Sequence, residues 1–181
     1  MNSIIRLSVC TTWIIFVMGQ YGFAQTDSED QYKVEFSKRN LGGPRLGITY
    51  LPGKTELVEK LGDHDVGRTL SQFGWHFEYQ VVPKGYGPSF VVEIVPLVAG
   101  VEYGKLIPSL TLAMGVRFPN GFEFGMGPNL LAGTDDVYSA LVFAVGKSIN
   151  YGGVSIPLNL VYATNPSGNR ISFIFGYAIR R

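Results

Sequence analysis

Apolar and polar residues alternate strictly over residues 71–82, SQFGWHFEYQVV. The odd positions carry Phe73, Trp75, Phe77, Tyr79 and Val81, and the even positions carry Gln72, Gly74, His76, Glu78 and Gln80. Because successive side chains of an extended chain point to opposite sides, a period of two predicts a β-strand with two unlike faces.

The same rhythm recurs along the chain, and turn-forming residues separate its repeats. It predicts strands over residues 45–51, 69–82, 90–101, 107–118, 121–131, 137–149, 154–163 and 170–181. Asn120-Gly121 is the strongest hairpin signal, because both residues tolerate a positive φ. One helix is expected after the first strand, with Thr55 as its N-cap and Gly62 as its stop.

The links between these segments are too short for crossover helices, so neighbouring strands are expected to pair antiparallel. The predicted fold class is all-β: an up-and-down antiparallel meander that closes into a roughly eight-stranded barrel. One short helix lies between the first two barrel strands. Closure hides the edge strands. Prolines 96, 108, 128 and 157 fall within strand patterns and are interpreted as strand ends or bulges.

The start of the chain has the layout of an export signal. A short segment with one positive charge, Arg6, precedes an apolar run and the small residues Gly22 and Ala24. This layout predicts that residues 1–24 form a signal peptide. The alternative is a transmembrane anchor, for which the uncharged run is short. The following residues, 25–44, are predicted to form a mobile polar leader, and residues 45–181 the β-barrel domain.

Composition narrows the classes of function. Arg6 is one of 15 basic residues, so cleavage would leave 14 basic against 14 acidic residues and a neutral chain. Neutrality argues against nucleic acid as a partner. The one cysteine, Cys10, lies within the predicted signal, so neither a disulfide framework nor a thiolate site is expected in the mature chain.

The two faces of the strands differ in size and polarity. One face is large and apolar, whereas the other is rich in glycine with a few charges, as expected for a membrane barrel with a polar interior. The predicted polar cluster of the lumen comprises Gln72, His76, Glu78, Glu93, Arg117 and Glu123. The aromatics predicted to face lipid or to line a pocket are Phe73, Trp75, Phe77, Phe122, Phe124, Phe173 and Phe175.

This combination of alternation, turn spacing and an export signal resembles the small eight-stranded outer-membrane β-barrels of bacteria, of which the OmpA transmembrane domain is the familiar type. SQFGWHFE and GFEFGMGPNL are also similar to segments of exported bacterial proteins of unassigned activity. The resemblance implies an outer-membrane location and a structural or small-molecule-interacting role. It implies no catalysis and no cofactor, with membrane lipid or a hydrophobic small molecule as the partner.

Two other hypotheses remain open. A soluble periplasmic barrel of the lipocalin kind would turn the aromatics inward around a hydrophobic ligand, with the short helix as a lid. A lipid-modifying enzyme would use His76 and Glu78 with Ser71, although the serine has the opposite parity. Asp63-His64-Asp65 is interpreted as a solvated helix exit, and no metal site is predicted.

Overall fold

The computed structural model describes residues 35–133 and 136–180, so the predicted signal peptide and the first half of the leader, residues 25–34, lie outside the described residues. The described chain contains one α-helix, α2 (Glu56–Asp63), and one 3-10 helix, η1 (Val101–Tyr103). The strands are β1 (Phe36–Tyr50), β2 (Thr69–Pro83), β3 (Ser89–Ala99), β4 (Ile107–Arg117), β5 (Phe122–Ala132), β6 (Val137–Tyr151), β7 (Val154–Thr164), β8 (Arg170–Gly176) and β9 (Ile179–Arg180). None of the helices in this described part is long and apolar enough to cross a membrane.

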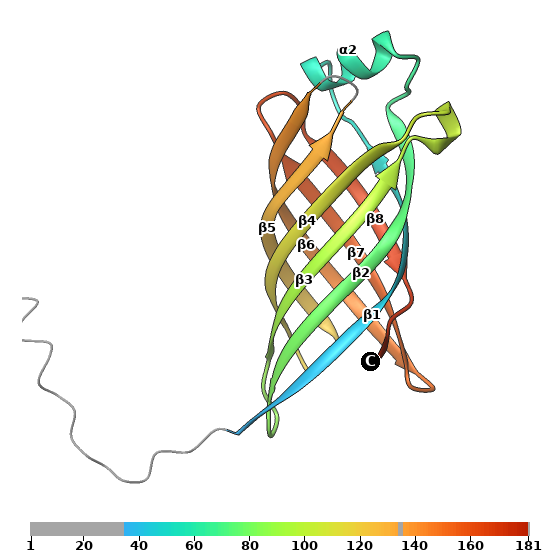
Figure 1. The fold of residues 1–181 in the computed structure, drawn as a ribbon. Helices are drawn as coiled ribbons and strands as arrows, with labels where there is room; N and C mark the ends of the chain where they lie inside the picture. The colour runs from blue at the N-terminus through green and yellow to red at the C-terminus, as the bar shows by residue number, and fades with distance from the viewer. Residues whose placement is uncertain (1–34, 134–135, 181) are drawn as a thin grey trace, which may run out of the picture. The chain divides into compact units, whose positions relative to one another are not determined.

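The strands form one closed antiparallel barrel, which confirms the predicted fold class (Figure 1). Each strand from β2 to β7 pairs with the next, and β1 closes the barrel by pairing with both β8 and β2. β9 continues β8, because both pair with β1 in one register (Arg45 opposite Gly176, Gly42 opposite Ile179). Pro44 lies in the gap between these two ladders, and a proline has no N–H to donate. We call each unit of the barrel wall a stave: β1 to β7 are one stave each, and β8 together with β9 forms the eighth.

The first stave begins earlier than predicted. β1 starts at Phe36, and its pairing with β2 runs from Phe36 opposite Pro83 to Tyr50 opposite Thr69. Gly42-Gly43-Pro44 was expected to end the leader, but it lies inside the paired strand. The close approach of the segment between β8 and β9 explains the glycine: a Cβ on Gly43 would lie 1.7 Å from the carbonyl oxygen of Tyr177.

The prolines within strand patterns are not strand ends, except near the start of β4. Pro96, Pro128 and Pro157 are interior residues of β3, β5 and β7. The β2–β3 ladder is interrupted beside Pro96 and the β4–β5 ladder beside Pro128. Each of these prolines keeps its place in the register with the strand on its other side, so the loss of one donor is tolerated without a shift of register.

The two ends of the barrel differ (Figure 1). Because the number of staves is even, β1 starts and β9 finishes at the same end, which we name the terminal end. It carries the links 84–88, 118–121 and 152–153. The opposite end, the lid end, carries α2 and the links 51–68, 100–106, 133–136 and 165–169.

Helix α2 closes the lid end with an apolar side. Leu57 and Leu61 are buried, and they pack in one cluster with residues that line the barrel mouth. The members of this cluster are Leu51, Leu57, Leu61, Val66, Leu70, Ala99, Ile107, Leu131 and Tyr138. The amide of Leu57 also donates to the carbonyl of Ser167 in the β7–β8 link at 2.8 Å. The helix is thus fixed to both the mouth and an opposite loop.

The predicted helix limits are partly right. Thr55 occupies the N-cap position with extended φ and ψ, but its side chain makes no capping hydrogen bond. The helix continues through Gly62 to Asp63 and has His64 as its C-cap. The stop predicted at Gly62 is therefore wrong, since the final turn closes with the His64 amide donating to the Leu61 carbonyl.

Candidate functional site

The candidate site is the barrel interior, which holds two distinct regions. In the half next to the terminal end, charged and amide side chains from β1 to β5 converge, and all of them are buried or half-buried. We name this group the ionic network; its members are Arg45, His76, Glu78, Gln80, Glu93, Arg117 and Glu123. All seven occupy inward positions of their strands, opposite in parity to the apolar outer residues.

Arg117 is the centre of the ionic network. Its guanidinium binds Glu78 through two parallel contacts, Nη1 to Oε1 at 2.5 Å and Nη2 to Oε2 at 3.0 Å. Its Nε donates to Oε2 of Glu123 at 2.7 Å, and Nη2 lies 3.9 Å from Glu93. A forked pairing of this kind is the strongest arrangement open to an arginine and a carboxylate. Gln80 adds a hydrogen bond from Nε2 to Glu78.

The protonation of His76 follows from its neighbours. Nη2 of Arg45 lies 2.7 Å from Nδ1 of His76, and a guanidinium can only donate. Nδ1 therefore accepts, and the ring is neutral with its proton on Nε2. That proton points toward Glu78 and Glu93, whose carboxylate oxygens lie 3.5 and 3.6 Å from Nε2.

The same geometry disfavours a metal ion. His76, Glu78 and Glu93 offer ligand atoms within 4.8 Å of one another, which is a suitable spacing. However, the nitrogen that faces the carboxylates carries the ring proton, and a metal ligand must present a lone pair. A cation there would also lie beside the guanidinium groups of Arg45 and Arg117. The arrangement is that of a charge-compensated network.

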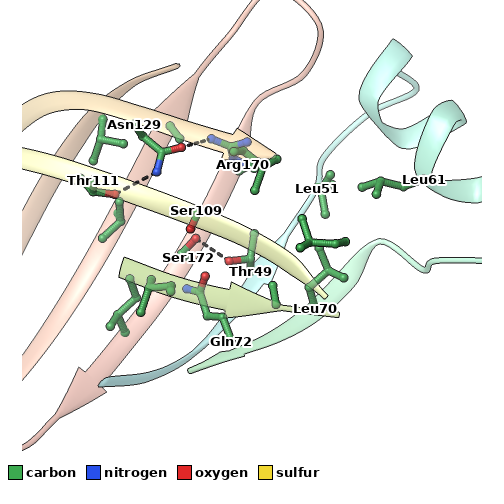
Figure 2. A pocket seen from close by; sticks show the side chains of 18 residues that line it. Thr49, Leu51, Leu61, Leu70, Gln72, Ser109, Thr111, Asn129, Arg170 and Ser172 are labelled. Carbon is green, nitrogen blue, oxygen red and sulfur yellow. Dashed lines mark hydrogen bonds between the residues drawn. The ribbon is translucent and has the colours of Figure 1, made fainter. Parts of the chain in front are cut away.

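The second interior region is a cavity of about 60 Å³ between the network and the lid end, which we name the lid cavity (Figure 2). Leu51, Leu61, Leu70 and Leu131 line it on the lid side. Polar and apolar side chains share the rest of the wall. The polar ones are Thr49, Gln72, Ser109, Thr111, Asn129, Arg170 and Ser172, and the apolar ones are Leu97, Ala99, Ile107, Val142, Val161, Ala163 and Ile174. A volume of this size holds a few water-sized spheres, since each needs about 10–15 Å³.

Hydrogen bonds order part of this polar wall (Figure 2). The hydroxyl oxygens of Thr49 and Ser172 lie 2.7 Å apart. Asn129 donates through Nδ2 to Oγ1 of Thr111 at 2.9 Å and accepts through Oδ1 from Nη2 of Arg170 at 2.6 Å. The amide of Asn129 is thereby oriented, with its oxygen toward Arg170, the only charged group among the described residues that line the cavity.

The structure brings five of the six predicted polar residues together. His76, Glu78, Glu93, Arg117 and Glu123 meet in the ionic network, whereas Gln72 lies nearer the lid end and lines the lid cavity. Sequence reasoning missed Gln80, Arg45, Asn129 and Arg170. Gln80 had a usable signal, because it shares the parity of His76 and Glu78 within the same strand.

The predicted aromatics lie on the outer surface. Phe73, Trp75, Phe77, Phe122, Phe124, Phe173 and Phe175 are all exposed, with exposed fractions between 38 and 55%. The soluble-carrier alternative is therefore not favoured, because it needs these rings around an internal ligand. The arrangement also separates the proposed catalytic set: Ser71 faces outward and binds Glu102 through its amide and hydroxyl, at 2.6 Å each.

Comparisons with known proteins find a coarse likeness in barrel architecture. A crystal structure of Ail, the attachment invasion locus protein of Yersinia pestis, aligns at 10% identity with a TM-score of 0.47, covering 80% of this chain and 97% of that chain. A second, of Ail in complex with the heparin analogue sucrose octasulfate, aligns at 11% identity with a TM-score of 0.47, covering 81% and 99%. No family model and no curated protein matches the sequence.

Proposed function

We propose that this chain is a membrane-spanning β-barrel of the bacterial outer membrane, with a structural or small-molecule-interacting role rather than a catalytic one. The observation that supports this most strongly is the outer face of the barrel. Where all eight staves pair, outward positions of the described strands carry apolar or small polar side chains, and Lys147 is the only charged one. It lies near the terminal end, with its Nζ 4.2 Å from the centre of the Phe122 ring.

A continuous apolar wall is costly in water and favourable in lipid. Each Å² of apolar surface moved out of water contributes roughly 25 cal/mol. Side chains such as Leu112, Met114, Phe124 and Phe143 remain exposed by 43–55% around the barrel, so the unfavourable contact with water would be extensive. Closure of the sheet also satisfies the backbone groups along the wall, which a hydrocarbon environment requires.

The interior supports a closed barrel rather than an open pore. Eight staves leave an interior that side chains can fill. The ionic network crosses it in one half, and the apolar cluster under α2 blocks the mouth of the other. We therefore do not propose that solutes diffuse through the barrel.

The proposal includes an orientation. Outer-membrane barrels have short turns on the periplasmic side and longer loops outside. The link 51–68 with α2 is the longest, and it lies at the lid end together with the links 100–106, 133–136 and 165–169. We therefore place the lid end outside the cell and the terminal end toward the periplasm.

The test compares two leucine-to-arginine variants in a barrel refolded into phospholipid vesicles. Leu112 is the central residue of β4 and faces outward, so Leu112→Arg should reduce the free energy of unfolding in urea by about 2–4 kcal/mol. The matched control is Leu106→Arg, because Leu106 is exposed in the link before β4. This control should change stability by no more than about 0.5 kcal/mol.

Fractionation provides a second criterion. The wild-type chain should stay with membranes after a carbonate wash and should migrate differently on gels before and after heating. A chain that purifies folded from periplasm without detergent, with equal stability in the two arginine variants, would refute the membrane proposal and restore the soluble barrel.

A further inference from the structure

Arg170 is a buried charge without an acidic partner. Its exposed fraction is 6%, and it is the first residue of β8 with its side chain directed into the barrel. Nη2 donates to Asn129, but Nη1 has no hydrogen-bond partner among the described residues. No ion pair to Arg170 occurs in this described part of the chain either. A buried guanidinium left in this state is strongly unfavourable, because a charge loses its hydration without compensation.

The other two interior arginines of the described chain, Arg117 and Arg45, differ from Arg170 because they lie beside carboxylates. Arg117 is bound by Glu78 and Glu123, and Arg45 lies against His76 beside the same carboxylates. The cavity around Arg170 is lined by apolar side chains and by hydroxyl and amide groups instead, with no carboxylate among the described residues. A compensating negative charge for Arg170 must therefore come from outside the described side chains.

The lid cavity contains a second unused donor. Gln72, with an exposed fraction of 8%, lines the same cavity from β2, and its Nε2 has no partner in the described chain. Its backbone pairs with Gly47, where a Cβ would lie only 3.1 Å from that Nε2. The glycine thus leaves room for the amide group in the interior. Arg170 and Gln72 thus line one cavity from different strands, and each has a buried N–H donor without a partner in the described chain (Figure 2).

We propose that the lid cavity binds a small monovalent inorganic anion of the size of chloride, held by the guanidinium of Arg170 with Gln72 as a second donor. The charge of Arg170 selects an anion, and N–H and O–H groups are the donors that an anion requires. The volume of about 60 Å³ admits a halide and excludes a large organic anion. The apolar cluster under α2 separates the ion from solvent, so its exchange should be slow.

The binding site lies inside the wall, so the proposal does not rest on membrane insertion and can be tested on the barrel folded in detergent. Crystals grown in sodium bromide provide a direct probe. An anomalous bromide peak is expected in the lid cavity within contact distance of Nη1 of Arg170. Crystals with water alone in the cavity would overturn the proposal.

Unfolding equilibria provide the second measurement. The barrel is refolded and unfolded in urea with sodium chloride or with sodium gluconate at equal ionic strength, since gluconate is too large for the cavity. Above the dissociation constant, the folded-to-unfolded ratio should rise roughly tenfold for each tenfold increase in chloride. It should not change with gluconate.

Three variants separate this site from general effects of salt. Arg170→Met should remove the chloride dependence, and Gln72→Leu, which keeps the arginine, should shift it to higher concentration. Lys60→Met on the exposed surface should keep the wild-type dependence. Equal curves in chloride and gluconate for the wild type, or an unchanged chloride dependence in Gln72→Leu and Arg170→Met, would refute the site. If Arg170→Met does not fold, the bromide map and Gln72→Leu decide.

Discussion

The two halves of the barrel interior are lined by different kinds of side chain, although the same strands form the wall of both. In the terminal half, five strands contribute charged or amide side chains that bind one another, with Arg117 between Glu78 and Glu123. In the lid half, hydroxyl and amide groups share the lining of a cavity with apolar side chains, and an apolar cluster under α2 closes it. The same staves continue through both halves, so the difference arises from the inward residues alone.

The two halves are also closed in different ways. The terminal half is closed by side chains of the wall itself, whereas the lid half is closed by a separate helix. The ionic network joins neighbouring staves from β1 to β5, and the backbone positions that carry its groups can move apart only if the wall itself unfolds. The plug in the lid half depends on one short helix within a long link, held by Leu57, Leu61 and a backbone hydrogen bond to Ser167. Such an element can open locally at a lower free energy than the whole barrel.

The largest expected effect is the loss of Arg117. Arg117→Met leaves the carboxylates of Glu78 and Glu123 buried without their cation, which should cost about 3–5 kcal/mol of unfolding free energy. The measurement is urea unfolding of the refolded barrel. The matched control, Lys60→Met, removes an exposed cation that binds Glu56 and Asp136, and exposed pairs are worth about 0–1 kcal/mol. Similar losses in both variants would remove the distinction between the two halves.

A smaller and local effect is expected from Leu61→Ala in the plug. The exposed fraction of Leu61 is 3%, and truncation of a buried leucine costs about 2–5 kcal/mol. Because α2 can detach without the wall, this cost should appear as faster hydrogen exchange and proteolysis within residues 51–68. The ladders around Arg117 should keep their protection. Equal loss of protection in β4 and in α2 would show that the lid and the wall open together.

The sequence was sufficient to predict the wall but less so its contents. A period of two and short links determine strands, antiparallel order and closure, because each is a local or nearest-neighbour property. The start of β1 was missed because Gly42-Gly43-Pro44 has the composition of a linker. In the barrel, the close approach of the segment between β8 and β9 requires glycine at position 43, and that requirement arises from residues far away in the sequence.

The interior partners could be predicted only in part, since parity gives the face but not the height in the barrel. It identified His76, Glu78 and Glu123 as inward residues, and strand tilt then decides which of them meet. Gln72 shares their face but lies nearer the lid end, where it lines the same cavity as Arg170 from the other end of the chain. No local pattern around Arg170 marks it as buried, because it directly follows the turn residues NPSGN.

The smallest effect is expected at the rim of the lid end, where a carboxylate is held outside the barrel. Burial of Glu102 acts to raise its pKa, but the hydrogen bonds from the Ser71 hydroxyl and amide outweigh it, so the pKa lies below its usual value. A carboxyl with a lowered pKa stabilises the fold above its ordinary pKa of about 4.3, and this contribution is lost as the pH falls through the folded value.

Ser71→Ala removes one of these two bonds and should move the pKa of Glu102 back toward its ordinary value, as followed by the carboxyl carbon resonance during an acid titration. Thr69, the outward residue two positions earlier in β2, provides the control, since Thr69→Ala leaves both donors of Ser71 in place. An effect confined to Ser71→Ala would show that the η1 link is held to the rim by its own polar contacts, independently of α2. An equal shift in both variants would instead indicate that the whole lid end responds as one unit, contrary to a helix that opens alone.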